Sequence, residues 1–232
     1  MIVFDIDGTI LPGTSCERLF VRYLIKRKIL QPRHFINFCL RAPALIHNGL
    51  PFITKANKGY LRNFSSRDMK AIGEDFFKSD VIPRISSKAK ARIGDHLKSD
   101  ARVILFSGMP DFLLSNFSEL LGVSEYYGSL MEIKGERLTG RTVGPFPLAR
   151  GKIKALEMII RGCYSASNFN NSDKVTTIKN IVSINWTEIT FYADHWLDRF
   201  LLSKVGHPIA VNPQEKLLEL AQKNEWPIEY FN

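Results

Sequence analysis

The sequence predicts an α/β fold: a Rossmann-like, doubly wound parallel sheet with helices on both faces and an α-helical cap inserted after the first strand. Short apolar runs at residues 2–6, 102–106 and 189–193 have the continuous hydrophobicity of parallel strands that are buried on both faces. Longer stretches with helical spacing of apolar residues separate these runs. Polar residues follow each run directly, at the strand ends where open α/β sheets bind ligands.

Helical periodicity locates the helices, together with residues that begin and end them. Asp111 and Pro213 stand near expected helix starts, whereas Gly122 and Gly206 follow expected helix ends. The helices are expected at 15–28, 33–47, 52–62, 66–79, 85–98, 111–121, 150–161, 196–205 and 213–224.

Chemically useful residues are concentrated at the end of the first apolar run, in Asp5-Ile6-Asp7-Gly8-Thr9. One aspartate can act as a nucleophile and the second as a general acid or base. Gly8 lets the chain turn sharply and approach a ligand with its amides, and the Thr9 hydroxyl can donate to a phosphate oxygen. This combination indicates a phosphoryl-transfer site. The alternative is an Asp-Gly turn whose aspartates only solvate a strand end.

Two phosphate-binding candidates come later in the chain. Ser107-Gly108 closes the second apolar run and places a hydroxyl and a glycine amide at a strand end. Lys152 opens a helix, where a cation opposes the helix dipole, so a bound anion would resolve the conflict. Taken singly, Ser-Gly is a common turn and Lys152 is an ordinary surface lysine.

Asp194 and Asp198 are metal-ligand candidates. Asp194 ends the third apolar run, and Asp198 follows one helical turn later. Such a pair suits a hard cation with oxygen ligands, for example Mg²⁺. Taken singly, Asp194 can cap a helix and Asp198 can be an exposed residue. The order of all these groups on successive strand ends is specific, and it favours chemistry.

In this order the residues resemble the motifs of the haloacid dehalogenase (HAD) superfamily, and within it the phosphoserine-phosphatase-like subfamily IB with a helical C1 cap. The resemblance covers nearly the whole chain. The segments that carry it are Phe4-Asp5-Ile6-Asp7-Gly8-Thr9-Ile10-Leu11, Phe106-Ser107-Gly108, Gly151-Lys152, Ala193-Asp194-His195-Trp196-Leu197-Asp198, residues 135–141 and residues 206–213.

The resemblance implies a two-step phosphatase mechanism. Asp5 attacks phosphorus to form an aspartyl-phosphate, while Asp7 protonates the leaving alkoxide and then activates water. Mg²⁺ is expected as the cofactor, because metal and lysine must cancel the repulsion between a carboxylate and a phosphate dianion. The implied metal ligands are Asp5, the backbone carbonyl of Asp7, Asp194 and Asp198, the last of them directly or as support. The implied phosphate-binding residues are Gly8, Thr9, Ser107, Gly108 and Lys152.

Two departures from the family pattern bear on function. In the fourth motif His195 and Trp196 are bulky, and His195 either fills space, which we favour, or adds a titratable group near the metal. Phosphoserine phosphatases carry a glutamate for the substrate ammonium early in the cap. Thr14 occupies the corresponding position here, and Glu17 follows a turn later. Both are candidate substrate contacts, but the simpler inference is that phosphoserine is not the substrate.

The resemblance also divides the chain into two parts. The catalytic core is expected at 1–13 and 85–232, and the helical cap at 14–84. Within the core we expect a β-hairpin at 129–144 and a polar loop insertion at 165–180, rich in Ser, Asn and Thr. We assign no function to this insertion.

The cap carries the positive charge of the chain. The whole sequence has a net charge of +9, and residues 15–67 hold eleven basic residues against Glu17 alone, a net +10. This charge is a solvated face, a device for attracting a multiply anionic substrate, or a contact surface for anionic lipid. Nucleic-acid binding is not expected, because no stacking platform or groove-reading motif accompanies the charge.

The composition fits a cytoplasmic enzyme. At 232 residues and 45% apolar content the chain can bury one substantial core. Cys16, Cys39 and Cys163 lack metal-ligand spacing and are interpreted as small hydrophobes in a reducing compartment. A strand begins almost at Met1, so no signal peptide is expected.

We therefore predict a Mg²⁺-dependent phosphomonoester hydrolase that acts on a small phosphorylated metabolite. The alternatives are a lipid head-group phosphatase at a membrane surface, a catalytically impaired HAD module that only binds ligands, and a phosphotransferase that uses an alcohol as acceptor. Retention of every charged site residue argues against the impaired module. Substrate and oligomeric state stay open.

Overall fold

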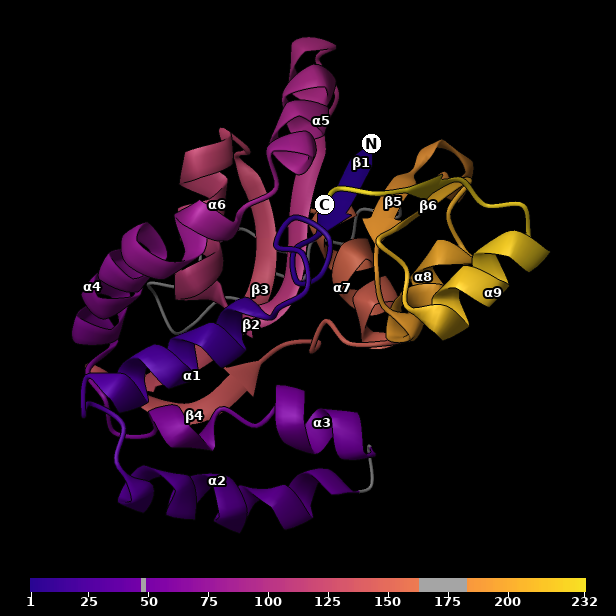
Figure 1. Ribbon diagram of the computed structural model, residues 1–232. Helices are drawn as coiled ribbons and strands as arrows, with labels where there is room; N and C mark the ends of the chain where they lie inside the picture. The colour runs from indigo at the N-terminus through magenta and orange to yellow at the C-terminus, as the bar shows by residue number, and fades with distance from the viewer. Residues whose placement is uncertain (47–48, 163–182) are drawn as a thin grey trace.

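A single seven-stranded sheet forms the centre of the molecule (Figure 1). The computed structural model describes residues 1–46, 49–162 and 183–232. The strand order is β4-β3-β2-β1-β5-β6-β7, parallel throughout except for the β3–β4 pair. The strands are β1 (Ile2–Asp5), β2 (Val103–Pro110), β3 (Glu125–Lys134), β4 (Arg137–Val143), β5 (Thr190–Ala193), β6 (His207–Val211) and β7 (Ile228–Glu229). The predicted α/β fold class is confirmed.

The central strands are apolar on both sides because both faces of the sheet are covered. Val3 belongs to one buried cluster and its neighbour Phe4 to the other, on the opposite face. Ile104 and Leu105 of β2 divide between the same two clusters. The continuous apolar runs in the sequence therefore report burial on two faces.

The helices are distributed over the two faces and over the cap beside them. Helices α4, α5 and α6 lie on one side of the sheet and α7, α8 and α9 on the other, while α1, α2 and α3 extend past the carboxyl ends of the strands (Figure 1). The bounds are α1 (Cys16–Lys26), α2 (Pro32–Leu45), α3 (Leu50–Lys55), α4 (Ser66–Phe76), α5 (Ser87–Lys98), α6 (Asp111–Leu121), α7 (Gly151–Ile160), α8 (Arg199–Leu202) and α9 (Glu215–Lys223). Shorter helical turns are η2 (Gly59–Leu61), η3 (Phe77–Val81), η4 (Ile82–Arg84), η6 (Trp186–Glu188) and η7 (Trp196–Asp198).

The helix expected at 52–62 is wrong. Helix α3 ends at Lys55, and the chain turns through buried Asn57 before η2. The Asn57 amide donates to the Phe38 carbonyl at 2.7 Å and its oxygen accepts from the Gly59 N–H at 3.0 Å. A Cβ on Gly59 would lie 2.7 Å from the Asn37 carbonyl oxygen, so this segment packs backbone to backbone against α2. These tertiary contacts override the helical periodicity.

The helix expected at 196–205 is also shorter than predicted, because η7 precedes α8 and α8 ends at Leu202. Strands β3 and β4 form an antiparallel hairpin at the edge of the sheet. The polar insertion expected at 165–180 lies outside the described residues, as does Cys163.

Candidate active site

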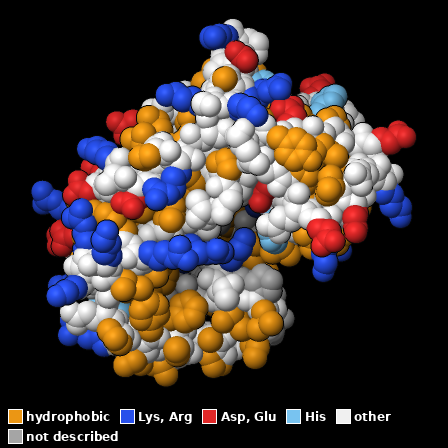
Figure 2. All heavy atoms as spheres, in the orientation of Figure 1, with side chains coloured by type: hydrophobic (Ala, Val, Ile, Leu, Met, Phe, Trp, Pro, Cys, Tyr) orange, Lys and Arg blue, Asp and Glu red, His pale blue; other side chains and the backbone are white. Residues whose placement is uncertain are grey.

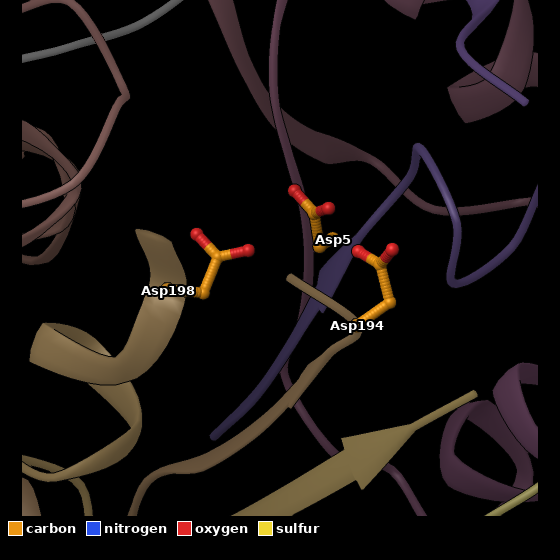
Figure 3. Close-up of side chains that lie close together, drawn as sticks. All are labelled: Asp5, Asp194 and Asp198. Carbon is orange, nitrogen blue, oxygen red and sulfur yellow. The ribbon is translucent and has the colours of Figure 1, made fainter. Parts of the chain in front are cut away.

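Three aspartates from separate parts of the chain meet at the carboxyl ends of β1 and β5. Asp5 is the last residue of β1, Asp194 directly follows β5, and Asp198 ends η7. All three are buried, and one oxygen of each lies within 4.8 Å of the others. Figure 3 shows their carboxylates around a common space, each carried by a different element.

Lys152, near the start of α7, provides the positive charge of this cluster. Its Nζ lies 2.8 Å from Asp5 Oδ1 and 2.5 Å from Asp198 Oδ1. The side chain is buried, and the ammonium also lies over the rings of Phe106 and Phe191. The two carboxylates therefore offset the unfavourable position of a cation at a helix start, a role that the sequence analysis gave to a bound anion.

The cluster is short of positive charge. Burial raises the pKa of Asp5 to about 7 and that of Asp194 to about 9, and repulsion from the neighbouring carboxylates adds to both shifts although Lys152 opposes them. Asp194 Oδ1 is buried and has no hydrogen-bond partner among the described residues. A hard divalent cation with oxygen ligands would satisfy both conditions, so the donor set fits Mg²⁺.

Gly8 allows the loop after β1 to approach Asp194 closely. Its φ is +82°, and a Cβ at this position would lie 1.9 Å from Asp194 Oδ2. The loop is closed by a hydrogen bond from the Gly8 N–H to the Leu11 carbonyl at 2.9 Å. Asn212, beyond β6, donates to the Gly8 carbonyl at 3.0 Å and fixes the loop from the other side.

The Asp7 carboxylate is outside the aspartate cluster. Its two oxygens accept hydrogen bonds from the Ser15 hydroxyl and the Cys16 N–H, each at 2.9 Å. Cys16 is the first residue of α1, so Asp7 joins the catalytic loop to the start of the cap.

Among the expected phosphate-binding residues, Ser107 directly follows Phe106, the residue of β2 that pairs with Asp5, so it lies beside the cluster. Ser107 is buried in β2, where the pairing with β3 shifts register between Phe106 and Pro110, so the strand continues past the expected end. The Ser107 Oγ accepts from the Met109 N–H at 3.2 Å, and Ser129 donates to the Gly108 carbonyl at 2.8 Å. The buried Thr9 hydroxyl has no partner among the described residues.

His195 and Trp196 have structural contacts. The His195 Nδ1 accepts from the Leu197 N–H at 3.1 Å and so caps η7, which carries Asp198. Burial lowers the pKa of His195. The Arg199 guanidinium lies 4.3 Å from the centre of the Trp196 ring. These bulky residues hold the segment between two of the aspartates.

A buried polar cluster lies in the cap, around Glu17. One Glu17 oxygen forms an ion pair with Lys58, and the other accepts from the Tyr60 hydroxyl at 2.7 Å. Lys58 is completely buried and also donates to the Lys55 carbonyl at 2.6 Å. Thr14, the other candidate substrate contact, is half-buried in the turn before α1. Both carboxylate oxygens of Glu17 are therefore already engaged.

Comparisons with known proteins agree with this geometry. The family model for haloacid dehalogenase-like hydrolases matches residues 2–203. The chain belongs to the haloacid dehalogenase-like hydrolase family. Within that family it is phosphoserine-phosphatase-like, of subfamily IB, and it is an enzyme of the phosphatase type. These findings confirm the family resemblance of the motifs.

Two curated relatives align with almost the whole chain. A histidinol-phosphatase of Neisseria meningitidis is 23% identical, over 100% of this chain and 98% of its own length. Phosphoserine phosphatase SerB1 of Mycobacterium tuberculosis is 25% identical, over 98% of this chain and 70% of its own length.

Solved structures share the fold. A protein of unknown function from Bordetella pertussis superposes with a TM-score of 0.78 at 22% identity, covering 100% of this chain and 98% of its own. A phosphoserine phosphatase with an analogue of its phospho-aspartyl intermediate superposes with a TM-score of 0.61 at 18% identity, covering 100% of this chain and 92% of its own.

The sequence analysis did not single out Ser15 or Lys58. Ser15 directly precedes an amphipathic helix, which is a helix-start signal that could have identified it. Lys58 is one of eleven basic residues in its segment, and only the fold distinguishes it as the buried one.

Proposed function

We propose that this protein is a Mg²⁺-dependent phosphomonoester hydrolase that works through an aspartyl-phosphate on Asp5. The observation that carries the proposal is the buried cluster of Asp5, Asp194 and Asp198 around Lys152. When bound, Mg²⁺ would be held by these aspartates and the Asp7 carbonyl, and it would neutralise negative charge on the phosphoryl group.

In the first step an Asp5 carboxylate oxygen attacks phosphorus, and the bond from phosphorus to the leaving oxygen breaks. Asp7 gives its proton to the leaving alkoxide. In the second step Asp7 takes a proton from water as the water oxygen attacks phosphorus, which frees Asp5 and inorganic phosphate. Lys152, Ser107 and the amides after Asp5 stabilise the phosphoryl oxygens in both steps.

The substrate is a small phosphorylated metabolite whose leaving group carries no free ammonium. The support is the Glu17–Lys58 pair, because a substrate ammonium would have to displace a buried lysine from its partner. Phosphoserine and histidinol phosphate, the compounds in the relatives' names, both carry an amino group. We therefore expect this chain to differ from them in specificity.

Hydrolysis of p-nitrophenyl phosphate tests the proposal. Turnover is expected with Mg²⁺, and we expect EDTA to abolish it and Asp5→Asn to lower kcat by about a thousandfold or more. Asp68→Asn, an exposed aspartate on α4, is the matched control and is expected to keep full activity. An Asp5→Asn enzyme that retains turnover would refute Asp5 as the nucleophile.

A substrate panel tests the specificity. Glycerol phosphate is expected to be hydrolysed with a higher kcat/KM than phosphoserine or histidinol phosphate. A preference for the amino compounds would overturn the inference that the ion pair with Lys58 keeps Glu17 from receiving a substrate ammonium. Adding a second alcohol as a possible acceptor separates hydrolysis from transfer. A transferase would pass part of the phosphate to this acceptor, so it would release less inorganic phosphate than leaving alcohol from the substrate. A lipid head-group phosphatase is the second candidate, because α2 of the cap exposes Ile36 and Leu40 beside the groove that Arg41 lines.

A further inference from the structure

Helix α2 has apolar side chains on its outer side, in addition to Phe35 and Phe38, which pack half-buried against the core. None of its 14 residues is buried. Ile36, Leu40 and Pro43 follow at spacings of four and three residues, so they share one face of the helix, and all three are exposed. Leu40 has 71% of its surface exposed. The side of an amphipathic helix that faces away from the core normally carries polar residues, so this second apolar side has no partner among the described residues.

The apolar face continues past the end of α2. Ile46, its C-cap, is 65% exposed, and Leu50 at the start of α3 is 75% exposed. We call Ile36, Leu40, Pro43, Ile46 and Leu50 the outer cap surface. Figure 2 shows hydrophobic side chains gathered over the lower part of the molecule, where Figure 1 places α2 and α3. Large contiguous apolar patches of this kind mark interaction sites.

A basic groove runs along one flank of α2. It has a volume of about 400 Å³ and lies between α2, η2 and the β3–β4 hairpin. We call it the basic groove because its lining includes five cationic residues: Arg41, Arg62, Lys134, Arg137 and Arg141. Glu132 is the acidic residue that lines it.

Contacts fix this groove beside the outer cap surface. Asn37 and Arg41 directly follow Ile36 and Leu40 on the helix, so they point to the flank of the apolar face. Arg41 donates to the Gly140 carbonyl of the hairpin, and Arg62 donates to Asn37 at 3.5 Å. Crowding by Arg141 and Arg62 adds to the effect of burial in lowering the pKa of Arg41. The groove thus has an excess of positive charge that its own acid does not neutralise.

Charge favours an anionic partner over a second copy of the chain. Residues 15–67 carry eleven basic residues, and Glu17, their one acid, is engaged by Lys58 inside the cap. Two copies joined through this face would bring like charges together. An anionic bilayer offers apolar chains to the exposed side of the helix and lipid phosphates to the basic residues on its flank.

We propose that the outer cap surface and the basic groove dock this protein on bilayers of anionic phospholipid, with α2 lying in the plane of the membrane interface. Among the described residues, no helix is long and apolar enough to cross a bilayer. The proposal is independent of the catalytic residues.

Flotation with phosphatidylcholine vesicles, with and without phosphatidylglycerol, tests it. The protein is expected to bind vesicles that contain phosphatidylglycerol and to be released by high salt. Leu40→Asp is expected to weaken binding about tenfold or more, because it removes buried apolar area and adds a repelled charge. Ile82→Asp, at a residue 40% exposed on η4 outside the surface, is the matched control and is expected to bind normally.

The basic groove has its own test. Arg62→Gln with Arg141→Gln is expected to weaken binding about tenfold or more, from two lost cations. Lys70→Gln with Lys90→Gln, two exposed lysines on α4 and α5, is the control with the same change in net charge. Hydrolysis of p-nitrophenyl phosphate by each variant in the absence of vesicles shows whether it is folded, whatever its membrane binding.

Three outcomes would overturn the proposal. The first is no binding to anionic vesicles by a folded protein. The second is equal binding to neutral and anionic vesicles. The third is a dimer in light scattering that Leu40→Asp dissociates, without vesicle binding, because a second copy would then cover the surface.

Discussion

Lys152 has two functions that depend on the same contacts. Its ion pairs hold Asp5, the proposed nucleophile, and Asp198, a proposed metal ligand, in place inside the protein. Burial alone would lower the pKa of Lys152, but Asp198 and Asp5 together raise it, so the ammonium stays charged. A charged lysine that already contacts Asp5, the proposed nucleophile, is placed to stabilise the negative charge on the phosphoryl oxygens in the transition state.

The Lys152→Met variant separates charge neutralisation from metal binding. We expect kcat to fall by about a hundredfold or more, because the phosphoryl oxygens lose a positioned cation. Mg²⁺ should bind at least as tightly as in the wild type, since one competing cation is gone; calorimetric titration measures this. Lys154→Met, at an exposed position of the same helix, should change neither value. Weaker Mg²⁺ binding in Lys152→Met would mean that Lys152 serves mainly to position the ligands.

The buried Glu17–Lys58 ion pair is expected to contribute to the stability of the fold. Among the described residues, Lys58→Met leaves Tyr60 as the one side chain bonded to the Glu17 carboxylate, and we expect the free energy of unfolding to fall by about 3 kcal/mol. Glu17→Gln combined with Lys58→Met should recover most of that loss in urea unfolding. Equal losses in the single and double variants would show that Lys58 acts through packing. Lys55→Met, at an exposed neighbour, is the control.

Among the elements, the loop from β1 to α1 joins the catalytic site to the cap. Asp5 ends the strand, Gly8 makes room for Asp194, and Asp7 is tied to the first residues of α1. The loop therefore contacts the aspartate cluster at Gly8 and the start of the cap at Asp7.

The Gly8→Ala variant tests this geometry. A methyl group there would clash with the Asp194 carboxylate, so Mg²⁺ affinity and kcat/KM should each fall by about a hundredfold. Gly13→Ala is a strict control, since Gly13 also has a positive φ of +67° but nothing lies within 4 Å of a Cβ there. Gly13→Ala should lower the free energy of unfolding by about 1 kcal/mol, because alanine disfavours a positive φ, and it should keep full activity. Normal activity in Gly8→Ala would mean that the loop can rearrange.

The parallel strands could be predicted from sequence because burial on both faces gives them continuous apolar runs. In an open α/β sheet the carboxyl ends of these strands lie at the ligand-binding edge, so the polar residues that follow the runs could be predicted to meet there. The turn through Asn57 could not be predicted, because it depends on backbone contacts with α2 that are remote in sequence. Likewise, α2 has apolar residues on two sides, and periodicity does not say which of the two packs on the core.

At the scale of the whole molecule, core and cap meet around the site. Phe52 of α3 lies against Phe146, in the loop before α7, with ring centres 6.0 Å apart. The Lys58 ammonium lies 5.6 Å from the centre of the same Phe146 ring. The loop that leads into α7 and Lys152 therefore also packs against the cap.

Metal binding should be visible in the stability of the whole fold. The cluster's ligands come from residues 5, 194 and 198, which meet only when the sheet is formed, so Mg²⁺ binds the folded chain and not the unfolded one. At a hundredfold excess over Kd this adds about 2.7 kcal/mol, enough to raise Tm by several degrees relative to EDTA. Differential scanning fluorimetry measures the shift.

The Asp194→Asn variant tests whether the stabilising Mg²⁺ binds at the aspartate cluster. Neutral asparagine removes repulsion from Asp5 and Asp198, so without Mg²⁺ the variant should melt at or above the wild-type Tm. With Mg²⁺ it should gain much less than the wild type, because a ligand is missing. The two proteins should thus reverse their order of stability on adding metal. If both gain equally, the cation that stabilises the fold binds outside this cluster, and the metal assignment fails.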